Sequence, residues 1–317
     1  MSLKLAKGFC LSWRGCVVSQ NASSYKPRGV IVVTGGKGGT GKTVIAVNLA
    51  ASLVKAGYRV LIVDIDVENP CTYTLLSAEL EVVKEVRAFK PVIDETKCLL
   101  CGACVEKCPT HALVLVPGSK VMFFRTLCEG CAACLYSCPS GAVGRGEEVV
   151  GWVKAGKAGG TSLVVGELKP GDRRYHEVME ETLEYARRVW SSYDVVVVDT
   201  PPGAGKGVAS ALRLADLIIM VTEPTRLGLA DLSRLHKLAR EVGRREIVVV
   251  NKYDLPGGVV DEVEKFAERE GLMLAKIRYD PLLVRSYVEG KLVVEEHPGS
   301  PSARDIGVLT RLTVALL

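Results

Sequence analysis

The chain of 317 residues is 48% hydrophobic, which is enough to build one large α/β domain with a substantial core and a smaller module beside it. Its formal net charge of +5, from 41 basic and 36 acidic residues, is mild and gives no strong nucleic-acid or membrane signal. No apolar run approaches the roughly 18 residues that a membrane-spanning helix needs, so we expect a globular, cytoplasmic protein. The arginine pairs Arg173-Arg174, Arg187-Arg188 and Arg244-Arg245 are scattered, and we expect them on solvated faces.

The cysteines are distributed unevenly along the chain. Residues 1–27 are predicted to be an N-terminal extension without a clear export signal, in which Cys10 and Cys16 are incidental. Eight of the eleven cysteines fall in two identical four-cysteine runs further along. This spacing indicates metal ligands in a reducing compartment and not a disulfide framework. Cys71, which lies shortly after Asp66, is predicted to be a small buried hydrophobic residue, with a metal ligand between two subunits as the alternative.

The first folded segment is a strand, a glycine-rich loop and a helix in that order. The apolar run 30–33 is short and β-branched, whereas residues 44–55 have helical spacing and end before Gly57. The loop between them, GGKGGTGKT, contains the spacing G-x-x-x-x-G-K-[ST], in which small residues let backbone N–H groups converge on phosphate oxygens at a helix N-terminus. Lys42 is expected to reach the β and γ phosphates and Thr43 to hold Mg²⁺. The predicted phosphate contacts are Gly35, Gly36, Lys37, Gly38, Gly39, Thr40, Gly41, Lys42 and Thr43.

A second lysine in the loop, Lys37, narrows the class of phosphate-binding protein that the motif indicates. With Lys37 in place, GGKGGTGKT resembles the deviant Walker A motif of the MinD/ParA superfamily of ATPases. The resemblance implies that Lys37 contacts the nucleotide phosphates across a dimer interface. It therefore implies ATP as the ligand and a nucleotide-dependent homodimer; a solvated loop lysine is the alternative.

The next strand, 59–63, ends on Asp64-Ile65-Asp66. Ligands of parallel α/β sheets bind at the carboxyl ends of the strands, so these carboxylates would face the phosphate loop. A plain turn at the strand end is the alternative. The resemblance to MinD/ParA proteins implies that Asp66 orients or activates the attacking water. Asp64 would lie closer to the Mg²⁺ shell.

The two cysteine runs repeat with an offset of 30 residues as a duplicated C-x₂-C-x₂-C-x₃-C-P. Thiolates are soft ligands suited to iron in a sulfide cluster, and in such runs the fourth cysteine binds the other cluster. The predicted ligand sets of two [4Fe-4S] clusters are Cys98, Cys101, Cys104 and Cys138, and Cys128, Cys131, Cys134 and Cys108. Residues 93–147 resemble a bacterial two-cluster ferredoxin. Zinc is the competing interpretation.

After these runs the α/β pattern returns. A valine-rich strand, 194–198, ends in Asp199-Thr-Pro-Pro-Gly203. An aspartate at this place can bind Mg²⁺ through water, and Gly203 lets a backbone N–H approach the γ-phosphate. The string is similar to the Walker B and switch II segment of MinD-like ATPases.

Two further strands, 217–221 and 246–250, lead into Glu223 and into Asn251-Lys252-Tyr253-Asp254. We expect Glu223, Asn251 and Asp254 to contact the nucleotide, the last two at the base. N-K-x-D is also the guanine-reading pattern of GTPases, so GTP stays open beside ATP. The C-terminal helix, 302–317, is predicted to be scaffold, with membrane attachment as a minor alternative.

The sequence therefore predicts a doubly wound, mostly parallel α/β P-loop NTPase of the SIMIBI or MinD-like class with an inserted α+β bacterial-type ferredoxin domain. The ATPase domain would comprise residues 28–92 and 148–317, and the insertion residues 93–147. The predicted catalytic residues are Lys37, Lys42, Asp66 and Asp199. We expect Mg²⁺-dependent ATP hydrolysis in which nucleotide-dependent dimerisation is coupled to electron transfer through two [4Fe-4S] clusters, with an unknown redox or iron–sulfur partner protein. Cluster assembly or carriage, and a redox-sensing regulatory or partitioning switch, are the alternatives.

Overall fold

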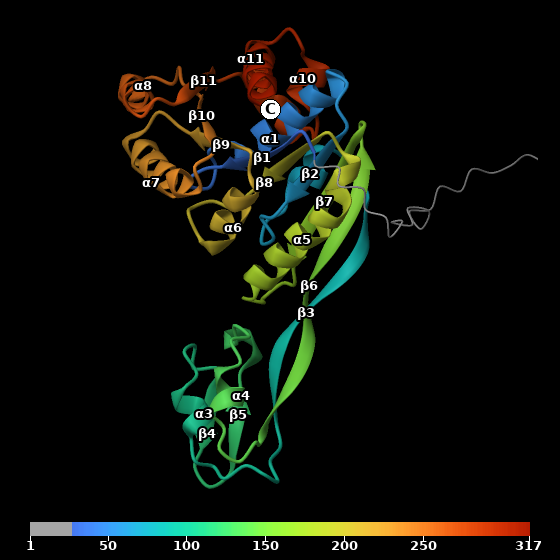
Figure 1. Cartoon of the computed structure of the whole chain (residues 1–317), viewed down its shortest axis with the longest axis vertical. Coiled ribbons are helices and arrows are strands. Elements are labelled where there is room, and N and C mark those ends of the chain that lie inside the picture. The colour runs from blue at the N-terminus through green and yellow to red at the C-terminus, as the bar shows by residue number, and fades with distance from the viewer. Residues whose placement is uncertain (1–26) are drawn as a thin grey trace, which may run out of the picture.

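A computed structural model describes residues 27–317, arranged as an α/β body from which a long arm carries a small module (Figure 1). The predicted N-terminal extension, with Cys10 and Cys16, lies outside the described residues except for Pro27. Within residues 27–317, no helix is long and apolar enough to cross a membrane.

The body is built on a nine-stranded sheet in the order β11-β10-β9-β1-β8-β2-β7-β6-β3. All neighbours from β11 to β7 are parallel, whereas β6 is antiparallel to β7 and β3 is antiparallel to β6. The strands are β1 Gly29–Thr34, β2 Val60–Asp64, β3 Leu80–Ile93, β6 Val143–Ala158, β7 Thr161–Leu168, β8 Val195–Asp199, β9 Leu217–Thr222, β10 Arg245–Asn251 and β11 Met273–Ile277. This is the doubly wound, mostly parallel sheet that the sequence predicts.

Helices cover both faces of the sheet. They are α1 Lys42–Lys55, α2 Thr72–Leu75, α5 Tyr175–Val189, α6 Lys206–Leu214, α7 Arg226–Val242, α8 Val260–Arg269, α9 Pro281–Val288, α10 Val293–Glu296 and α11 Pro301–Leu316. One core packs α5, α6, α7 and α8 against one face, and a second packs α1, α10 and α11 against the other. Along β1, Val30 and Val32 belong to the first core and Ile31 and Val33 to the second, because successive strand side chains point to opposite faces. Burial on both faces explains the continuous apolar runs.

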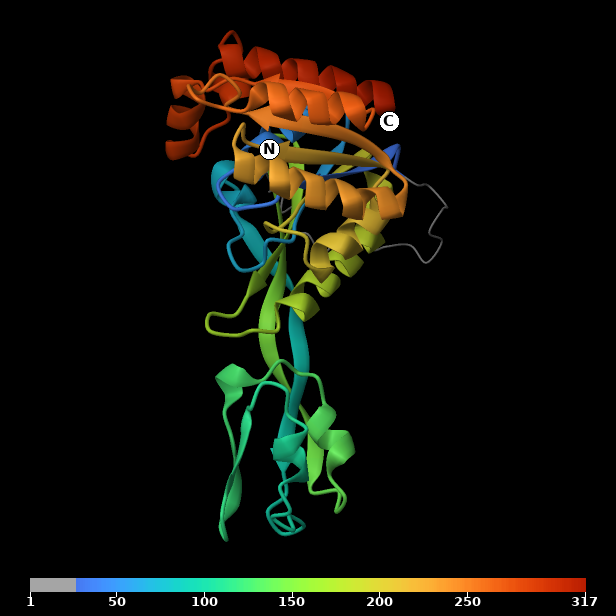
Figure 2. The ribbon, with the colours of Figure 1, turned by 90° about the vertical axis from the view of Figure 1, so that its left-hand side faces the viewer.

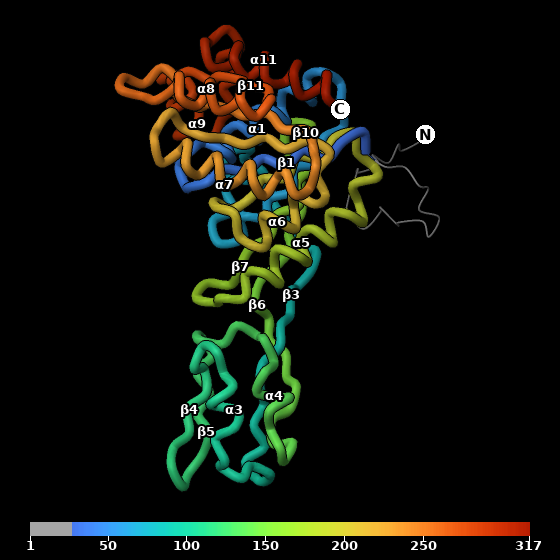
Figure 3. The backbone as a smooth tube through the Cα atoms, turned by 60° about the vertical axis from the view of Figure 1, so that its left-hand side comes forward, coloured from blue at the N-terminus to red at the C-terminus, as the bar shows by residue number. Residues whose placement is uncertain are grey.

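The arm is formed by β3 and β6, which pair from Leu80 with Gly156 to Ile93 with Val143. Two register irregularities, between Val82 and Lys84 and between Val86 and Arg87, interrupt the ladder. Such bulges bend a strand pair and increase its twist. The far half of the pair leaves the body and reaches the module, as the side view and the backbone tube show (Figure 2, Figure 3).

The module consists of residues 94–142, between the two arm strands. Its elements are α3 Ala103–Glu106, β4 Leu113–Val116, β5 Lys120–Phe123, the 3-10 turn η2 Arg125–Leu127 and α4 Ala133–Ser137. Its small core includes Leu113, Val121 and two of the cysteines, Cys104 and Cys134. The module and the body therefore have separate cores joined by the arm.

Candidate functional site

The phosphate loop follows β1 at the carboxyl edge of the sheet and leads into α1. Gly39 and Gly41 have φ angles of 81° and 92°, in the left-handed region that favours glycine. A Cβ on Gly41 would lie 2.4 Å from Nδ2 of Asn251, so the loop and the neighbouring strand end leave no room for a side chain there. No side chain caps the N-terminus of α1. Its first N–H groups, together with the helix dipole, make an anion site of the kind that binds phosphate.

Lys42, the first residue of α1, is buried, and its Nζ donates a hydrogen bond to the carbonyl oxygen of Lys37 at 3.2 Å. Burial lowers the pKa of Lys42, and the nearby carboxylates of Asp199 and Asp66 oppose that shift. The expected phosphate lysine therefore lies among the expected acidic residues.

Thr43 and Asp199 meet across the loop. Oγ1 of Thr43 donates a hydrogen bond to Oδ2 of Asp199 at 2.6 Å, while the buried Oδ1 of Asp199 has no hydrogen-bond partner within the described chain. Burial and the neighbouring Asp64 raise the pKa of Asp199 well above its usual value. A hydroxyl beside an unsatisfied buried carboxylate oxygen fits a hydrated Mg²⁺ shell, and the ion's charge would favour the ionised acid.

Asp64 lies beside Asp199 at neighbouring strand ends, and its side chain also binds the turn that follows β2. Its Oδ1 accepts a hydrogen bond from the backbone N–H of Asp66, and its Oδ2 accepts from the backbone N–H groups of Cys71 and Thr72 and from Oγ1 of Thr72, at 2.9–3.2 Å. Asp64 thus holds the turn that presents Asp66, and its nearness to the Mg²⁺ shell stays a prediction. Burial raises the pKa of Asp66, which lies near Lys42.

Lys37 and Lys252 share Glu223. Nζ of Lys37 is 3.2 Å from Oε2 of Glu223, and Nζ of Lys252 is 2.8 Å from Oε1. Burial opposes ionisation, but the hydrogen bonds from the two lysines keep the pKa of Glu223 below its usual value. Glu223, predicted to contact the nucleotide, therefore holds the lysine that was predicted to reach across a dimer interface.

Asn251 and Asp254, which were predicted to contact the nucleotide base, form hydrogen bonds with the protein backbone. Nδ2 of Asn251 donates to the carbonyl oxygen of Thr40 at 2.8 Å, and Oδ1 of Asp254 accepts from the N–H of Tyr279 at 2.6 Å. Gly203 has a φ of 96°, and its N–H donates to the carbonyl oxygen of Gly35 at 3.0 Å. Asn251 and Gly203 thus hold the phosphate loop from two strand ends.

The eight module cysteines surround two cavities. The tip set, at the far end of the arm beside Ile93 and Val143, is Cys98, Cys101, Cys104 and Cys138. The junction set, nearer the body beside Phe89 and Pro91, is Cys108, Cys128, Cys131 and Cys134. The space between the lining side chains, counted together with the open solvent that adjoins it, is about 330 Å³ at the tip set and about 290 Å³ at the junction set. The structure thus groups the cysteines as their spacing predicts, with the fourth of each run in the other set.

Burial and hydrogen bonding differ among the thiols. Burial raises the pKa of Cys104, and raises that of Cys134 to about 11. The N–H of Ala112 donates to Sγ of Cys108 at 3.2 Å, and the N–H of Gly130 donates to Sγ of Cys128 at 3.4 Å. Four thiols around one cavity, some with N–H donors on sulfur, are a donor set suited to an iron–sulfur cluster. Within residues 27–317, no three His, Cys, Asp or Glu side chains were found that could hold a single metal ion.

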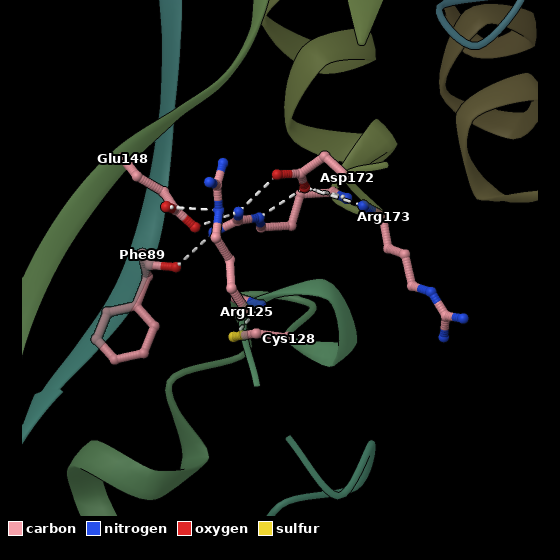
Figure 4. Close-up of polar contacts among 8 residues, drawn as sticks. Phe89, Arg125, Cys128, Glu148, Asp172 and Arg173 are labelled. Atoms are coloured by element: carbon pink, nitrogen blue, oxygen red, sulfur yellow. Dashed lines mark hydrogen bonds and ion pairs between the residues drawn. The ribbon is translucent and has the colours of Figure 1, made fainter. Parts of the chain in front are cut away.

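Arg174 is the residue that sequence reasoning placed wrongly. We expected the pair Arg173-Arg174 on a solvated face, but only Arg173 is exposed, and Arg174 is 1% exposed. Arg174 precedes α5 and bonds Asp172, Glu148 and the arm strand β3 (Figure 4). The nearby Asp172 was the available sequence signal for a buried ion pair.

Comparisons with known proteins agree with this geometry. Residues 31–293 match the model of the CobQ/CobB/MinD/ParA nucleotide binding domain. The chain is 30% identical over 263 residues to the uncharacterized protein MJ0579 of Methanocaldococcus jannaschii, covering 83% of this chain and 90% of that protein. It is 27% identical to the iron-sulfur cluster carrier protein of Pyrococcus abyssi, covering 79% and 74%. The cell division ATPase MinD of Pyrococcus furiosus has the same fold, with a TM-score of 0.57 at 18% identity over 91% of this chain and 99% of MinD.

Proposed function

This chain belongs to the CobQ/CobB/MinD/ParA family of nucleotide-binding domains, and we propose that it is a Mg²⁺-dependent ATPase that assembles or delivers iron–sulfur clusters. The observation that carries this proposal is that one chain combines a phosphate loop facing acidic strand ends with two cavities, each surrounded by four cysteines.

The nucleotide half of the proposal assigns a task to each group at the sheet edge. The loop N–H groups and Lys42 bind the ATP phosphates, and Thr43 and Asp199 hold Mg²⁺, directly or through water. Asp66 orients the attacking water. Lys37 leaves Glu223 and contacts the nucleotide of a second copy in a nucleotide-dependent homodimer, as the resemblance to MinD/ParA proteins implies.

The second half of the proposal concerns the cysteines and assigns one [4Fe-4S] cluster to the tip set and one to the junction set. Such clusters supply one-electron chemistry when bound. Cys104 and Cys134 anchor each set inside the module core, whereas Cys101 and Cys131 are exposed. Each set therefore offers one thiol on the surface, where an acceptor protein could approach.

Assembly or delivery is placed ahead of electron transfer because a relative with a similar chain is named an iron-sulfur cluster carrier protein. Electron transfer, our expectation from the sequence, is the second candidate. It is favoured by the completeness of both four-cysteine sets and by the N–H donors on Cys108 and Cys128, which suit a retained cluster.

A transfer assay separates the two candidates. The chain, carrying iron-55-labelled clusters, is mixed anaerobically with an apo-ferredoxin acceptor, with MgATP, with MgADP or without nucleotide. Delivery predicts that MgATP accelerates the movement of label to the acceptor, and that Lys42→Ala abolishes the acceleration. Retention of all label, with reversible one-electron reduction of both centres, would contradict delivery and support electron transfer.

A further inference from the structure

Arg174 lies at the place where the body meets the module. Its Nη2 is 2.5 Å from Oε1 of Glu148 and 2.6 Å from Oδ2 of Asp172, its Nε is 2.8 Å from Oδ1 of Asp172, and its Nη1 donates to the carbonyl oxygen of Phe89 at 3.1 Å. All of these partners belong to the arm strands or to the loop before α5. A guanidinium satisfied on every side in this way is held rigidly, because its planar fork fits two carboxylates at once.

The same network reaches the junction set. Nε of Arg125, in the 3-10 turn that ends just before Cys128, is 2.9 Å from Oε2 of Glu148, so Glu148 bridges the two arginines (Figure 4). A Cβ on Gly130 would lie 3.3 Å from Cδ of Arg174, and the N–H of Gly130 donates to Sγ of Cys128. The stem of Arg174 therefore packs against the loop that carries two junction cysteines, Cys128 and Cys131.

The two cysteine sets differ in this respect. The cavity of the tip set is lined, apart from its cysteines, by Ile93, Leu99, Gly102, Val121, Pro139, Ser140, Ala142 and Val143. The junction cavity includes Glu129, and the Cys128 loop beside it packs at Gly130 against the buried side chain of Arg174. The charged residues beside the tip set, Glu95 and Lys120 near Cys98, are exposed, whereas Arg174 beside the junction set is buried. Two sets with the same ligand spacing thus lie in different electrostatic surroundings.

The loop that carries Arg174 is also tied to the nucleotide edge. The N–H of Leu168, at the end of β7, donates to the carbonyl oxygen of Val67, the residue after Asp66, at 2.8 Å. The N–H of Lys169 donates to the carbonyl oxygen of Val150 in the arm at 2.8 Å. The N–H of Asp172 donates to the carbonyl oxygen of Lys169 at 3.0 Å. The loop that carries Arg174 is therefore anchored to the body and the arm, while the Arg174 side chain contacts the module loop that carries Cys128.

We propose that Arg174 is a positioning residue for the junction set, which holds the Cys128 loop against the body and raises the reduction potential of the centre bound there but not that of the tip centre. A nearby positive charge favours the reduced, more negative state of a cluster. The inference rests on the proposed function in one respect, that the junction set holds a redox-active iron–sulfur centre.

The test is an anaerobic redox titration followed by electron paramagnetic resonance, with iron quantified in every sample. The full-length chain is compared with Arg174→Gln, Arg174→Lys and, as a matched control, Arg173→Gln, which removes the same charge from the exposed neighbour. The Cys104→Ser background, which disables the tip set, identifies the junction signal.

Arg174→Gln is expected to change the reduction equilibrium of the junction centre at least tenfold, a shift of about 59 mV to more negative potential for one electron, and to leave the tip centre unmoved. Arg174→Lys, which keeps the charge, should stay near the wild-type potential. Glu148→Gln, which removes a negative charge from the same network, should shift the junction centre in the opposite direction, and it tests the proposal even where Arg174→Gln fails to fold.

Three results would overturn the inference but not the proposed function. They are equal shifts in the reduction potentials of both centres, no shift in either Arg174→Gln or Glu148→Gln, and an equal shift in Arg173→Gln. A wild-type chain that binds no iron would instead contradict the proposed function itself. The iron analysis therefore separates the two failures.

Discussion

Replacing Asn251 with alanine tests whether this residue reads the base or holds the phosphate loop. Its Nδ2 donates to the carbonyl oxygen of Thr40 at 2.8 Å, and both residues are buried. Asn251→Ala leaves that carbonyl without its donor, which costs about 1–3 kcal/mol. If phosphate binding needs the loop in this conformation, the same energy appears as a roughly 5- to 150-fold weaker affinity for any nucleotide.

Isothermal titration calorimetry with MgADP and with MgGDP distinguishes the two roles. A loop-holding residue predicts that both affinities fall by the same factor, because the phosphates are common to the two ligands. Asn48→Ala is the matched control: Asn48 is also buried and bonds Val44 and Val294, away from the loop, so its loss should lower stability and not nucleotide affinity. Unchanged affinities in Asn251→Ala, or a change confined to one nucleotide, would show that Asn251 does not act by holding the phosphate loop.

Further outcomes follow from the same geometry. Lys42→Ala should abolish MgATP binding in calorimetry while the chain stays folded. Asp66→Ala should bind MgATP but hydrolyse it at least about 100-fold more slowly, so that a dimer accumulates in size-exclusion chromatography; wild-type turnover would remove its role. Cys104→Ser should lower bound iron by roughly half, because the other set keeps its four thiols. Side-chain hydrogen bonds from Arg59 lower the pKa of Asp194 to about 2, so its stabilisation should be complete above about pH 4 and be lost as the pH falls toward 2. Asp194→Asn should flatten the acid limb of the thermal-stability profile, and the exposure of the pair limits the change to about 1 kcal/mol or less.

Local spacing was sufficient to predict much of the chemistry. The phosphate loop and the Asp199 strand end depend on neighbours in the sequence, so the strand, loop and helix were found where expected. The grouping of Cys108 with the later run also follows from ligand spacing, and the cavities agree with it.

The arm was not predicted because its strands lack the usual pattern. The far half of β3 and β6 extends beyond the sheet as a two-stranded pair. Phe89 on one face packs into the module core, whereas residues such as Val92 on the other face stay exposed. A strand pair that is covered unevenly along its length needs neither a continuous apolar run nor a strict alternation.

Contacts between side chains from elements far apart in the chain could not be predicted from the sequence either. Arg174 is buried because Asp172 and Glu148 neutralise it, and Glu148 comes from the far arm strand. Asn251 and Glu223 carry the residue types of nucleotide contacts, but their partners, Thr40 and the two lysines, are set by how the strand ends meet.

We propose that one chain combines a nucleotide site of the CobQ/CobB/MinD/ParA family with two iron–sulfur centres. The most direct test of this proposal is the quantification of iron, acid-labile sulfide and zinc in the anaerobically purified full-length chain. If both cysteine sets hold a [4Fe-4S] cluster, the chain should contain about eight iron and about eight sulfide atoms and no stoichiometric zinc. About two zinc atoms per chain without sulfide would contradict the proposal.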